Sequence, residues 1–354
     1  MDNTASDTLI DVDDNTDPES TIPETETTPV NLPNTYDVII VGGGPAGLTA
    51  GLYAARGGQK TLILEGIMES STVMPGGQLR LTPEIENFPG FAGGEGSELV
   101  DVIRHQALSF GAEIIGEKAT NIDLSGTVKL VTGSDFPGIG EEQTHHGRAV
   151  ILATGAVARR LGVPGEDENF GRGVSTCATC DGFFFKGGKV TVVGGGDTAI
   201  EDALYLTSLA EEVTLVHRRD QFKAKGKDVE KLLSRPNINI IWHSVIEEVV
   251  DVGGKVTGTT VKNTQTGETT FVPSQGLFVA IGHDPATELL ANKEGAYILD
   301  LTESGYVVAN SNTAETSIPG FYVAGDVSDD RYRQAVTAAA SGCKAAMDAI
   351  AYLG

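Results

Sequence analysis

Two glycine-rich turns, each placed between an apolar strand and a helix, constrain the fold of this chain more than any other feature. The first lies in YDVIIVGGGPAGLTAGLYAARGGQKTLILEG, where Gly42, Gly44 and Gly47 occupy the positions of a GxGxxG fingerprint. The first glycine permits a tight turn, the second lets a pyrophosphate approach the backbone, and the third lets helix and strand pack closely. We expect a buried strand from residue 36, then a helix that ends at the glycine pair 57–58.

An acidic residue follows this first turn at the distance expected for a residue that binds a ribose. Glu65 lies at the expected end of the second strand, 18 residues after Gly47. A carboxylate at this place accepts hydrogen bonds from the hydroxyls of an adenosine ribose. A fingerprint set between strand and helix, with the acid in position, indicates a dinucleotide site for a ribose that carries no 2′-phosphate.

The same pattern recurs in KVTVVGGGDTAIEDALYLTSLAEEVTLVHRRDQF, with Gly194, Gly196 and Ala199 at the GxGxxA positions. No acid follows the second strand here. Arg218 and Arg219 stand in its place, where cations would bind a 2′-phosphate and a carboxylate would repel it. A solvated surface turn is the alternative interpretation of the two arginines.

Two sites of opposite ribose chemistry predict two different cofactors, FAD at the first and NADPH at the second. Electrons would then enter from nicotinamide and pass to flavin. The fold class that follows is α/β, with two Rossmann-like dinucleotide-binding domains, and 354 residues are enough for two such domains.

A cysteine pair supplies the next electron acceptor. TCATCDG contains Cys177 and Cys180, and the chain has only one other cysteine, Cys343. A zinc site requires four ligands, and none of the histidines has a companion at metal-binding spacing, so we expect no metal. A short structural disulfide is the other alternative, but a cytosolic thiol pool would keep it reduced. We interpret the pair as a redox dithiol and Cys343 as a buried packing residue.

The charge of the chain excludes several partners. Its net charge is −24, so its surface field would repel nucleic acid and anionic membranes. Residues 1–34 contain nine acids and no Lys or Arg, and we expect a disordered acidic tail there. The chain has no apolar run of membrane-spanning length, and its first residues resemble neither a signal peptide nor a transit peptide. We therefore expect a soluble, cytoplasmic protein.

A set of motifs in fixed order carries a family resemblance. They are GGGPAG, GGQL, ENFPG, ATG, CATCDG, GGGDTA, HRRDQF, FVAIGHDP, TSIPGFYVAGDV and RQAVTAAASGC. Through them, residues 36–354 resemble the low-molecular-weight thioredoxin reductases. The resemblance implies an FAD domain of residues 35–157 and 286–354, into which an NADPH domain of residues 158–285 with the dithiol is inserted. The segments 153–155 and 282–285 would be the two crossing strands.

The resemblance also assigns site residues. The FAD set is Gly42, Gly44, Gly47, Glu65, Gln78, Asn87, Asp326, Arg333, Gln334 and Ala335. The NADPH set is Gly194, Gly196, Asp197, Thr198, Ala199, His217, Arg218, Arg219 and Lys223. The family more often has arginine where this chain has Lys223, which keeps the charge but lacks the planar fork.

The implied reaction is thioredoxin-disulfide reduction, with electrons passing from NADPH through FAD and the dithiol to a separate thioredoxin or thioredoxin-like protein. Cys180 would face the flavin, Cys177 would attack the partner, and Asp181 would act as acid and base, with helix capping as its alternative role. The family also implies a homodimer and a rotation of the inserted domain about residues 156–160 and 283–286. A flavin-dependent dithiol oxidase, or a ferredoxin- or NADH-linked disulfide reductase of the same fold, remains the alternative function.

Overall fold

The structure is a computed structural model that describes residues 33–69, 73–292, 294–310 and 312–354. Apart from Pro33 and Asn34, the expected acidic tail lies outside these residues. Residues Asn34–Gly354 form one unit. In the part of the chain that the structure describes, no helix combines the length and the apolar character needed to span a membrane.

The first sheet is built mainly from the two ends of the unit. Its strand order is β3-β2-β1-β6-β5-β4, and β17 pairs with the end of β6. Contacts among β3, β2, β1, β6 and β17 are parallel, whereas β4, β5 and β6 pair antiparallel. The strands are β1 (Thr35–Val41), β2 (Thr61–Leu64), β3 (Glu113–Ile115), β4 (Lys118–Asp123), β5 (Lys129–Ser134), β6 (Glu142–Leu152) and β17 (Phe321–Val323).

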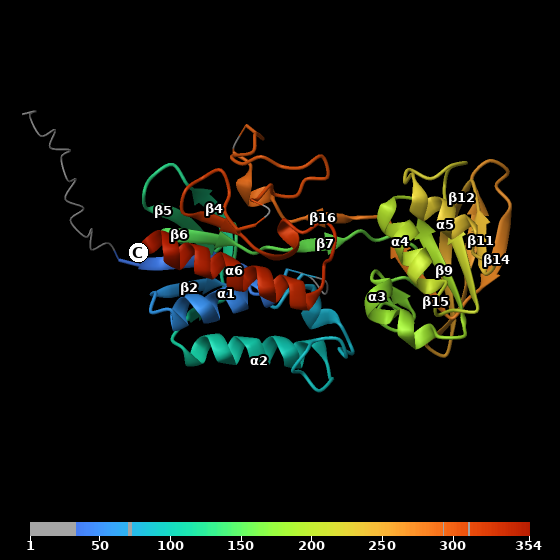
Figure 1. The fold of residues 1–354 in the computed structure, drawn as a ribbon, viewed down its shortest axis with the longest axis horizontal. Coiled ribbons are helices and arrows are strands. Elements are labelled where there is room, and N and C mark those ends of the chain that lie inside the picture. Colours follow the sequence, from blue (N-terminus) through green and yellow to red (C-terminus); the bar gives the residue numbers. More distant parts are fainter. Residues whose placement is uncertain (1–32, 70–72, 293, 311) are drawn as a thin grey trace, which may run out of the picture. The chain divides into compact units, whose positions relative to one another are not determined.

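Strand alternation divides the core of this sheet into two layers. Successive side chains of a strand point to opposite faces. Accordingly Val38 and Ile40 pack in one apolar cluster, and Ile39 and Val41 pack in another. The first cluster lies under α1 (Pro45–Arg56), α2 (Gly96–Ser109) and α6 (Ala335–Leu353). Figure 1 shows α1 and α6 side by side in this layer.

The second sheet is parallel and has the order β11-β10-β9-β15-β8. Its strands are β8 (Val174–Ser175), β9 (Lys189–Gly194), β10 (Glu212–Val216), β11 (Ile238–Ile241) and β15 (Gly276–Ala280). The associated helices are α3 (Ala178–Asp181), α4 (Asp197–Leu206) and α5 (Lys227–Leu233). An antiparallel sheet of β12 (Ser244–Val252), β13 (Lys255–Asn263) and β14 (Thr269–Pro273) accompanies it. Short 3₁₀ helices are η1 (Gln78–Leu81), η2 (Gly182–Phe185), η3 (Glu288–Leu290) and η4 (Gly325–Val327).

Two short strands connect the sheets. β7 (Ala156–Ala158) and β16 (His283–Pro285) pair antiparallel (Figure 1). β17 pairs with β6 of the first sheet although it follows all the strands of the second sheet in the chain, so the second sheet is inserted in the sequence of the first. The α/β fold with two dinucleotide-binding units is therefore confirmed. The predicted bounds of the crossing strands were wrong by a few residues. Residues 153–155 precede β7, and only His283–Pro285 of the second segment form β16.

Candidate active site

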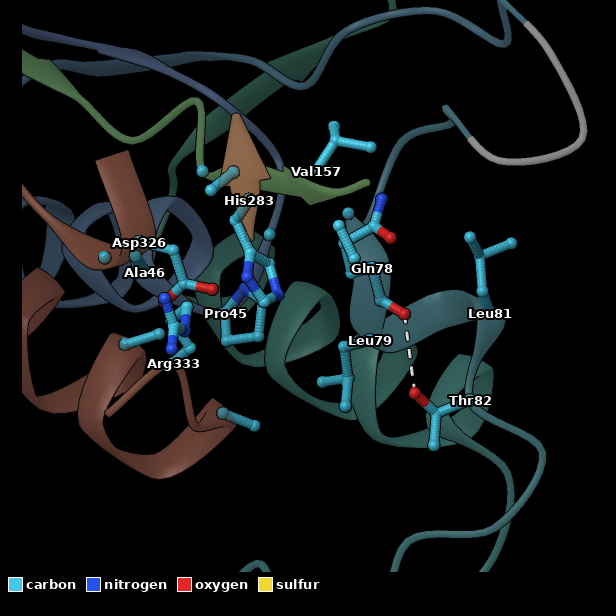
Figure 2. A pocket seen from close by; sticks show the side chains of 18 of the residues that line it. Pro45, Ala46, Gln78, Leu79, Leu81, Thr82, Val157, His283, Asp326 and Arg333 are labelled. Atoms are coloured by element: carbon cyan, nitrogen blue, oxygen red, sulfur yellow. Dashed lines mark hydrogen bonds between the residues drawn. The ribbon is translucent and has the colours of Figure 1, made fainter. Parts of the chain in front are cut away.

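A cavity of 1540 Å³ gathers residues from both fingerprint regions and from the dithiol. It is larger than the ~300–1,000 Å³ of ordinary small-molecule pockets, so an extended dinucleotide and a second reactant could share it. In Figure 2, Asp326, Arg333 and Pro45 lie on one side, and Gln78 and Leu79 of η1 lie on the other. Thirteen of the residues assigned from the sequence line it: Gly42, Gly44, Glu65, Gln78, Asn87, Cys177, Cys180, Asp181, Thr198, Asp326, Arg333, Gln334 and Ala335.

The first glycine turn forms an open cradle at the start of α1. Gly42 has φ +125°, and a Cβ on it would collide with the backbone of Ala153. A Cβ on Gly47 would collide with the carbonyl oxygen of Gly42, so Gly47 permits packing and does not line the cavity. At Gly44 the nearest atom to an added Cβ is 3.8 Å away, and this residue precedes α1 without a side-chain cap. The helix N-terminus is thus open to a pyrophosphate, which the resemblance places there.

Glu65 lies at the cavity wall directly after β2. Its carboxylate accepts two hydrogen bonds from Arg104 of α2, from Nε at 2.9 Å and from Nη2 at 3.1 Å. The pairing fixes the orientation of the carboxylate and leaves lone pairs for ribose hydroxyls. Sequence reasoning found the acid but missed Arg104, because a bidentate partner 39 residues away leaves no local pattern.

Asp326 is the most unusual carboxyl group of the cavity. It belongs to η4, directly after β17, and its Oδ1 has no hydrogen-bond partner among the described residues. Burial raises its pKa to about 7, and the charge of Asp329 adds to the rise. A buried polar atom without a partner is costly, so an unpaired oxygen directed at a cavity fits a ligand that carries hydroxyl groups. This is the chemistry of a flavin ribityl chain.

The two cysteines of TCATCDG form a disulfide bond in the structure. Cys177 is the N-cap of α3, and its Sγ accepts a hydrogen bond from the backbone N–H of Cys180 at 3.2 Å. The buried Ser175 accepts one from the backbone N–H of Cys177 at 3.0 Å and also bonds the side chain of Asp181. Asp181 stands at the N-cap position of η2, but its side chain makes no capping hydrogen bond there. Burial raises the pKa of Asp181, which favours a carboxyl group able to hold a proton beside the sulfurs.

Arg333 and Gln334 reach the dithiol region from the chain segment before α6. Gln334 donates from Nε2 to Thr179 Oγ1 at 3.1 Å, and the same nitrogen lies 3.6 Å from Cys177 Sγ and 3.8 Å from Cys180 Sγ. Arg333 donates to Thr198 Oγ1 at 3.3 Å. Arg333 also has φ 47°, a left-handed conformation that is unfavourable for a residue with a side chain. Arg333 therefore joins the segment before α6 to the start of α4, and Gln334 joins it to α3 and the dithiol.

Two further ionisable groups line the cavity and were missed by sequence reasoning. Burial raises the pKa of Asp202 of α4 to about 7, although Arg333 acts in the opposite direction. Burial lowers the pKa of His283 of β16 to about 4, with Arg333 adding to the effect. His283 lies in the motif FVAIGHDP, but neither the motif nor the helix that contains Asp202 indicates that these side chains face a cavity. Only the fold shows this position.

The second fingerprint forms the turn between β9 and α4, and of its assigned residues only Thr198 lines this cavity. Gly194 has φ +156°, and Gly196 precedes α4 with open space around it. Asp197 begins the helix, and Ala199 in its first turn is fully buried. After β10, Arg218, Arg219 and Lys223 are exposed, and in the described ranges no hydrogen bond or ion pair occupies their charged groups. They are available to an anion.

Cys343 differs from its expectation. It lies half-buried in α6, with its Sγ 3.9 Å from Met347 Sδ, and Met347 is itself exposed. Cys343 lies on the partly solvated side of the helix, so it is not a core residue. Among the residues that the structure describes, no group of His, Cys, Asp or Glu side chains is arranged to hold a metal ion.

Comparison with known families decides which class of protein has this arrangement. The family described as pyridine nucleotide-disulphide oxidoreductase matches residues 36–342. The chain belongs to this family. Membership makes it an oxidoreductase that links a pyridine nucleotide to a disulfide, and the thioredoxin reductases of the family contain FAD and use NADPH.

Individual relatives agree with the family match. The chain is similar to a thioredoxin reductase of Streptomyces clavuligerus, with 47% identity over 90% of this chain and 94% of the relative. It is similar to a thioredoxin reductase of Streptomyces coelicolor with 48% identity over the same shares. Among solved structures, thioredoxin reductase from Giardia duodenalis has a TM-score of 0.83 and 41% identity, and the match covers 90% of this chain and 99% of that one.

The raised pKa of Asp326 gives a prediction for the flavin-free protein. A carboxyl group with a folded pKa of about 7 and an ordinary value of 3.8 stabilises the fold at low pH, and this stabilisation is lost as the pH rises through 7. We expect Asp326→Asn to remove this loss. The free energy of unfolding in urea should decrease from pH 5 to pH 8, and this decrease should be on the order of 1–3 kcal/mol smaller in the variant than in the unmodified protein. The exposed Asp330→Asn is the control, and an equal pH dependence in all three proteins would contradict the account of Asp326.

Proposed function

We propose that the protein is an NADPH-dependent thioredoxin-disulfide reductase that acts in the cytoplasm. The observation that carries the proposal is the position of the Cys177–Cys180 disulfide in the same cavity as the glycine cradle of the first fingerprint. A disulfide beside a flavin site can exchange electrons with the flavin. A structural disulfide or a metal site would not account for this position of the cysteine pair.

The FAD set from the sequence fits the cavity. Gly42 and Gly44 would receive the pyrophosphate at the start of α1, and Glu65 would bind the adenosine ribose while Arg104 holds its orientation. Asp326 would accept from ribityl hydroxyls with its unpaired oxygen. Gln78, Asn87, Gln334 and Ala335 line the same cavity and would surround the flavin ring. Gly47 would act by packing alone.

The NADPH set lies around the second turn. Gly194 and Gly196 would let the pyrophosphate approach α4, while Asp197, Thr198 and Ala199 begin that helix. Arg218, Arg219 and Lys223 would bind the 2′-phosphate. Bound FAD and NADPH together supply a two-electron path from nicotinamide to the disulfide.

The chain's own groups then manage the sulfur chemistry. Reduction of the disulfide takes two electrons, breaks the S–S bond and leaves two thiol or thiolate sulfurs, so protons must move. Asp181, a buried carboxyl group whose pKa is raised, would supply and accept these protons. The backbone N–H of Cys180 donates to Cys177 Sγ and would stabilise a thiolate there. Cys177 would attack the disulfide of thioredoxin or a thioredoxin-like protein, and Cys180 would exchange electrons with the flavin.

The paired connecting strands support a rotation of the inserted domain, for which we propose the bounds 158–285 within an FAD domain of 35–157 and 286–354. Arg159 of the first connection bonds Asp284 of the second at 2.6 Å and 2.9 Å, and its backbone N–H donates to Gly282. Two connections joined in this way would turn together. The dithiol and the nicotinamide could then reach the flavin in succession. A homodimer, as the resemblance implies, completes the proposed assembly.

The first test couples NADPH oxidation to the reduction of a thioredoxin disulfide. The holoenzyme should oxidise NADPH only when oxidised thioredoxin is present and should bleach its flavin when NADPH is added without oxygen. A Cys180→Ser variant should lose turnover but keep the bleaching, because the substitution removes the dithiol and not the nucleotide path. Rapid oxygen consumption with a dithiol and no NADPH would instead identify a dithiol oxidase.

The second test concerns the choice of nucleotide. Two or three charge-assisted bonds to the 2′-phosphate contribute about 2–5 kcal/mol, which corresponds to a preference for NADPH over NADH of about 30-fold to several thousandfold. Neutral replacement of Arg218 and Arg219 together should raise the KM for NADPH steeply and leave that for NADH almost unchanged. Lys223→Gln should do the same more mildly.

Steady-state kinetics with both nucleotides measures this effect. Lys255→Gln, an exposed charge change at the start of β13, is the matched control and should alter neither KM. Equal kcat/KM values for NADH and NADPH in the unmodified enzyme would rule out the proposed nucleotide preference and favour an NADH-linked relative.

A further inference from the structure

The ring of His217 makes an unusual pair of contacts. His217 follows β10 directly and is only 8% exposed. Its Nδ1 lies 2.8 Å from the carbonyl oxygen of Gly194, and its Nε2 lies 3.0 Å from the carbonyl oxygen of Gln221. Both distances are those of good hydrogen bonds, and both partners are groups that can only accept. The ring therefore has to donate from both nitrogens.

The two acceptor contacts bear on the charge of the ring, because the number of N–H groups on imidazole depends on its protonation state. A neutral ring has one N–H and one nitrogen lone pair, so one of the two carbonyl oxygens would face a lone pair instead of a proton. Only the doubly protonated ring donates to both. We infer that His217 is a buried imidazolium that ties the pyrophosphate loop to the 2′-phosphate loop and adds a fixed positive charge to the nucleotide site. The inference rests on the proposed NADPH site and assigns His217 a positioning role within it.

The backbone around the ring confirms that the two loops are joined at this point. Lys223 and Ala224 of the second loop donate their N–H groups to the carbonyl oxygen of Gly195, at 2.7 Å and 3.2 Å. A Cβ on Gly195 would collide with the imidazole ring. The ring and the turn are thus in direct contact, and the loop with the arginines cannot move independently of the loop that precedes α4.

The charged groups near the ring do not neutralise it. Phe222 and Trp242 cover it, with ring centroids 5.5 Å and 6.0 Å from that of the imidazole. The charged and titratable residues on the adjoining elements are Asp197 at the start of α4, His243 after Trp242, and Arg218, Arg219, Asp220, Lys223 and Lys225 of the second loop. Within the described part of the chain, none of them makes a hydrogen bond or ion pair with the ring. The imidazolium is held only by carbonyl dipoles, so its charge remains available to an anion.

A fixed cation at this junction would favour the nucleotide with the additional phosphate. NADPH and NADH share the pyrophosphate, so the tie between the loops serves both. A positive charge at the junction of the loops attracts both nucleotides, and it attracts NADPH more because NADPH carries an additional phosphate. A variant that loses the charge but keeps part of the tie should therefore lower kcat/KM for NADPH more than kcat/KM for NADH. Glutamine is the suitable replacement, because its amide can still donate to one carbonyl oxygen but cannot be charged.

The first experiment reads the protonation state directly, without added NADPH or NADH. The holoenzyme is labelled with ¹⁵N-histidine, and the resonances of His217 are assigned by their loss in His217→Gln. At pH 7 both ring nitrogens should show the shifts of protonated nitrogen. His105→Gln on the exposed face of α2 is the control and should leave the His217 signals unchanged. One protonated and one unprotonated nitrogen in His217 would overturn the inference.

The second experiment measures kcat/KM for NADPH and NADH in the same variants. His217→Gln should lower the NADPH-to-NADH preference about threefold to tenfold, and His105→Gln should not change it. A parallel loss with both nucleotides, or an unchanged preference, would refute the contribution of the charge. Equal use of the two nucleotides by the unmodified enzyme would instead refute the proposed NADPH site, while the ¹⁵N spectrum would still decide the state of the ring.

Discussion

Contact between backbone segments at three glycines determines where the first sheet and its helices can lie. A side chain on Gly42 would collide with the backbone of Ala153, one on Gly47 with the carbonyl oxygen of Gly42, and one on Gly342 with the carbonyl oxygen of Ala46. Since α1 and α6 approach each other at Ala46 and Gly342, the start of α1 is held beside η4. Asp326 and the segment before α6 are thereby placed at the same cavity as the first glycine turn. A larger residue at any of the three positions would separate the groups that form the site.

The dithiol joins this arrangement through polar contacts. Gln334 reaches Thr179 and both sulfurs, and Arg333 reaches Thr198 at the start of α4. Hydrogen bonds of this kind are individually modest, about 0.5–1.5 kcal/mol each, and can exchange for water. A domain held to the flavin region by such contacts can leave it and return, as the proposed cycle requires. The tightly packed glycine contacts, by contrast, keep the flavin region itself rigid.

The sequence was sufficient to predict the parts of the protein that depend on local pattern. Both strand-turn-helix units, the strand before Asp326 and the pairing of the two cysteines follow from short-range spacing, and the structure contains them. The contact of Glu65 with Arg104, 39 residues away, and that of His217 with the carbonyl oxygen of Gly194, 23 residues away, could not be predicted, because they depend on distances across the fold. The contacts of Ser175 with Asp181 and of His217 with Gln221 are local, but they depend on loop conformations that residue spacing does not specify. The exposure of Cys343 was misjudged for the same reason: one apolar helix face does not reveal how much of it a neighbour covers.

The absorption spectra of Cys177→Ser and Cys180→Ser test most directly the central claim, that the flavin reduces the disulfide through Cys180 and the partner is reduced by Cys177. In Cys177→Ser, a Cys180 thiolate would remain beside oxidised flavin, and the account predicts a long-wavelength charge-transfer band that disappears on acidification. Cys180→Ser should show no such band, although both variants should still be reduced by NADPH. Equal spectra in the two variants, or a band in Cys180→Ser alone, would contradict the assigned order of the sulfurs.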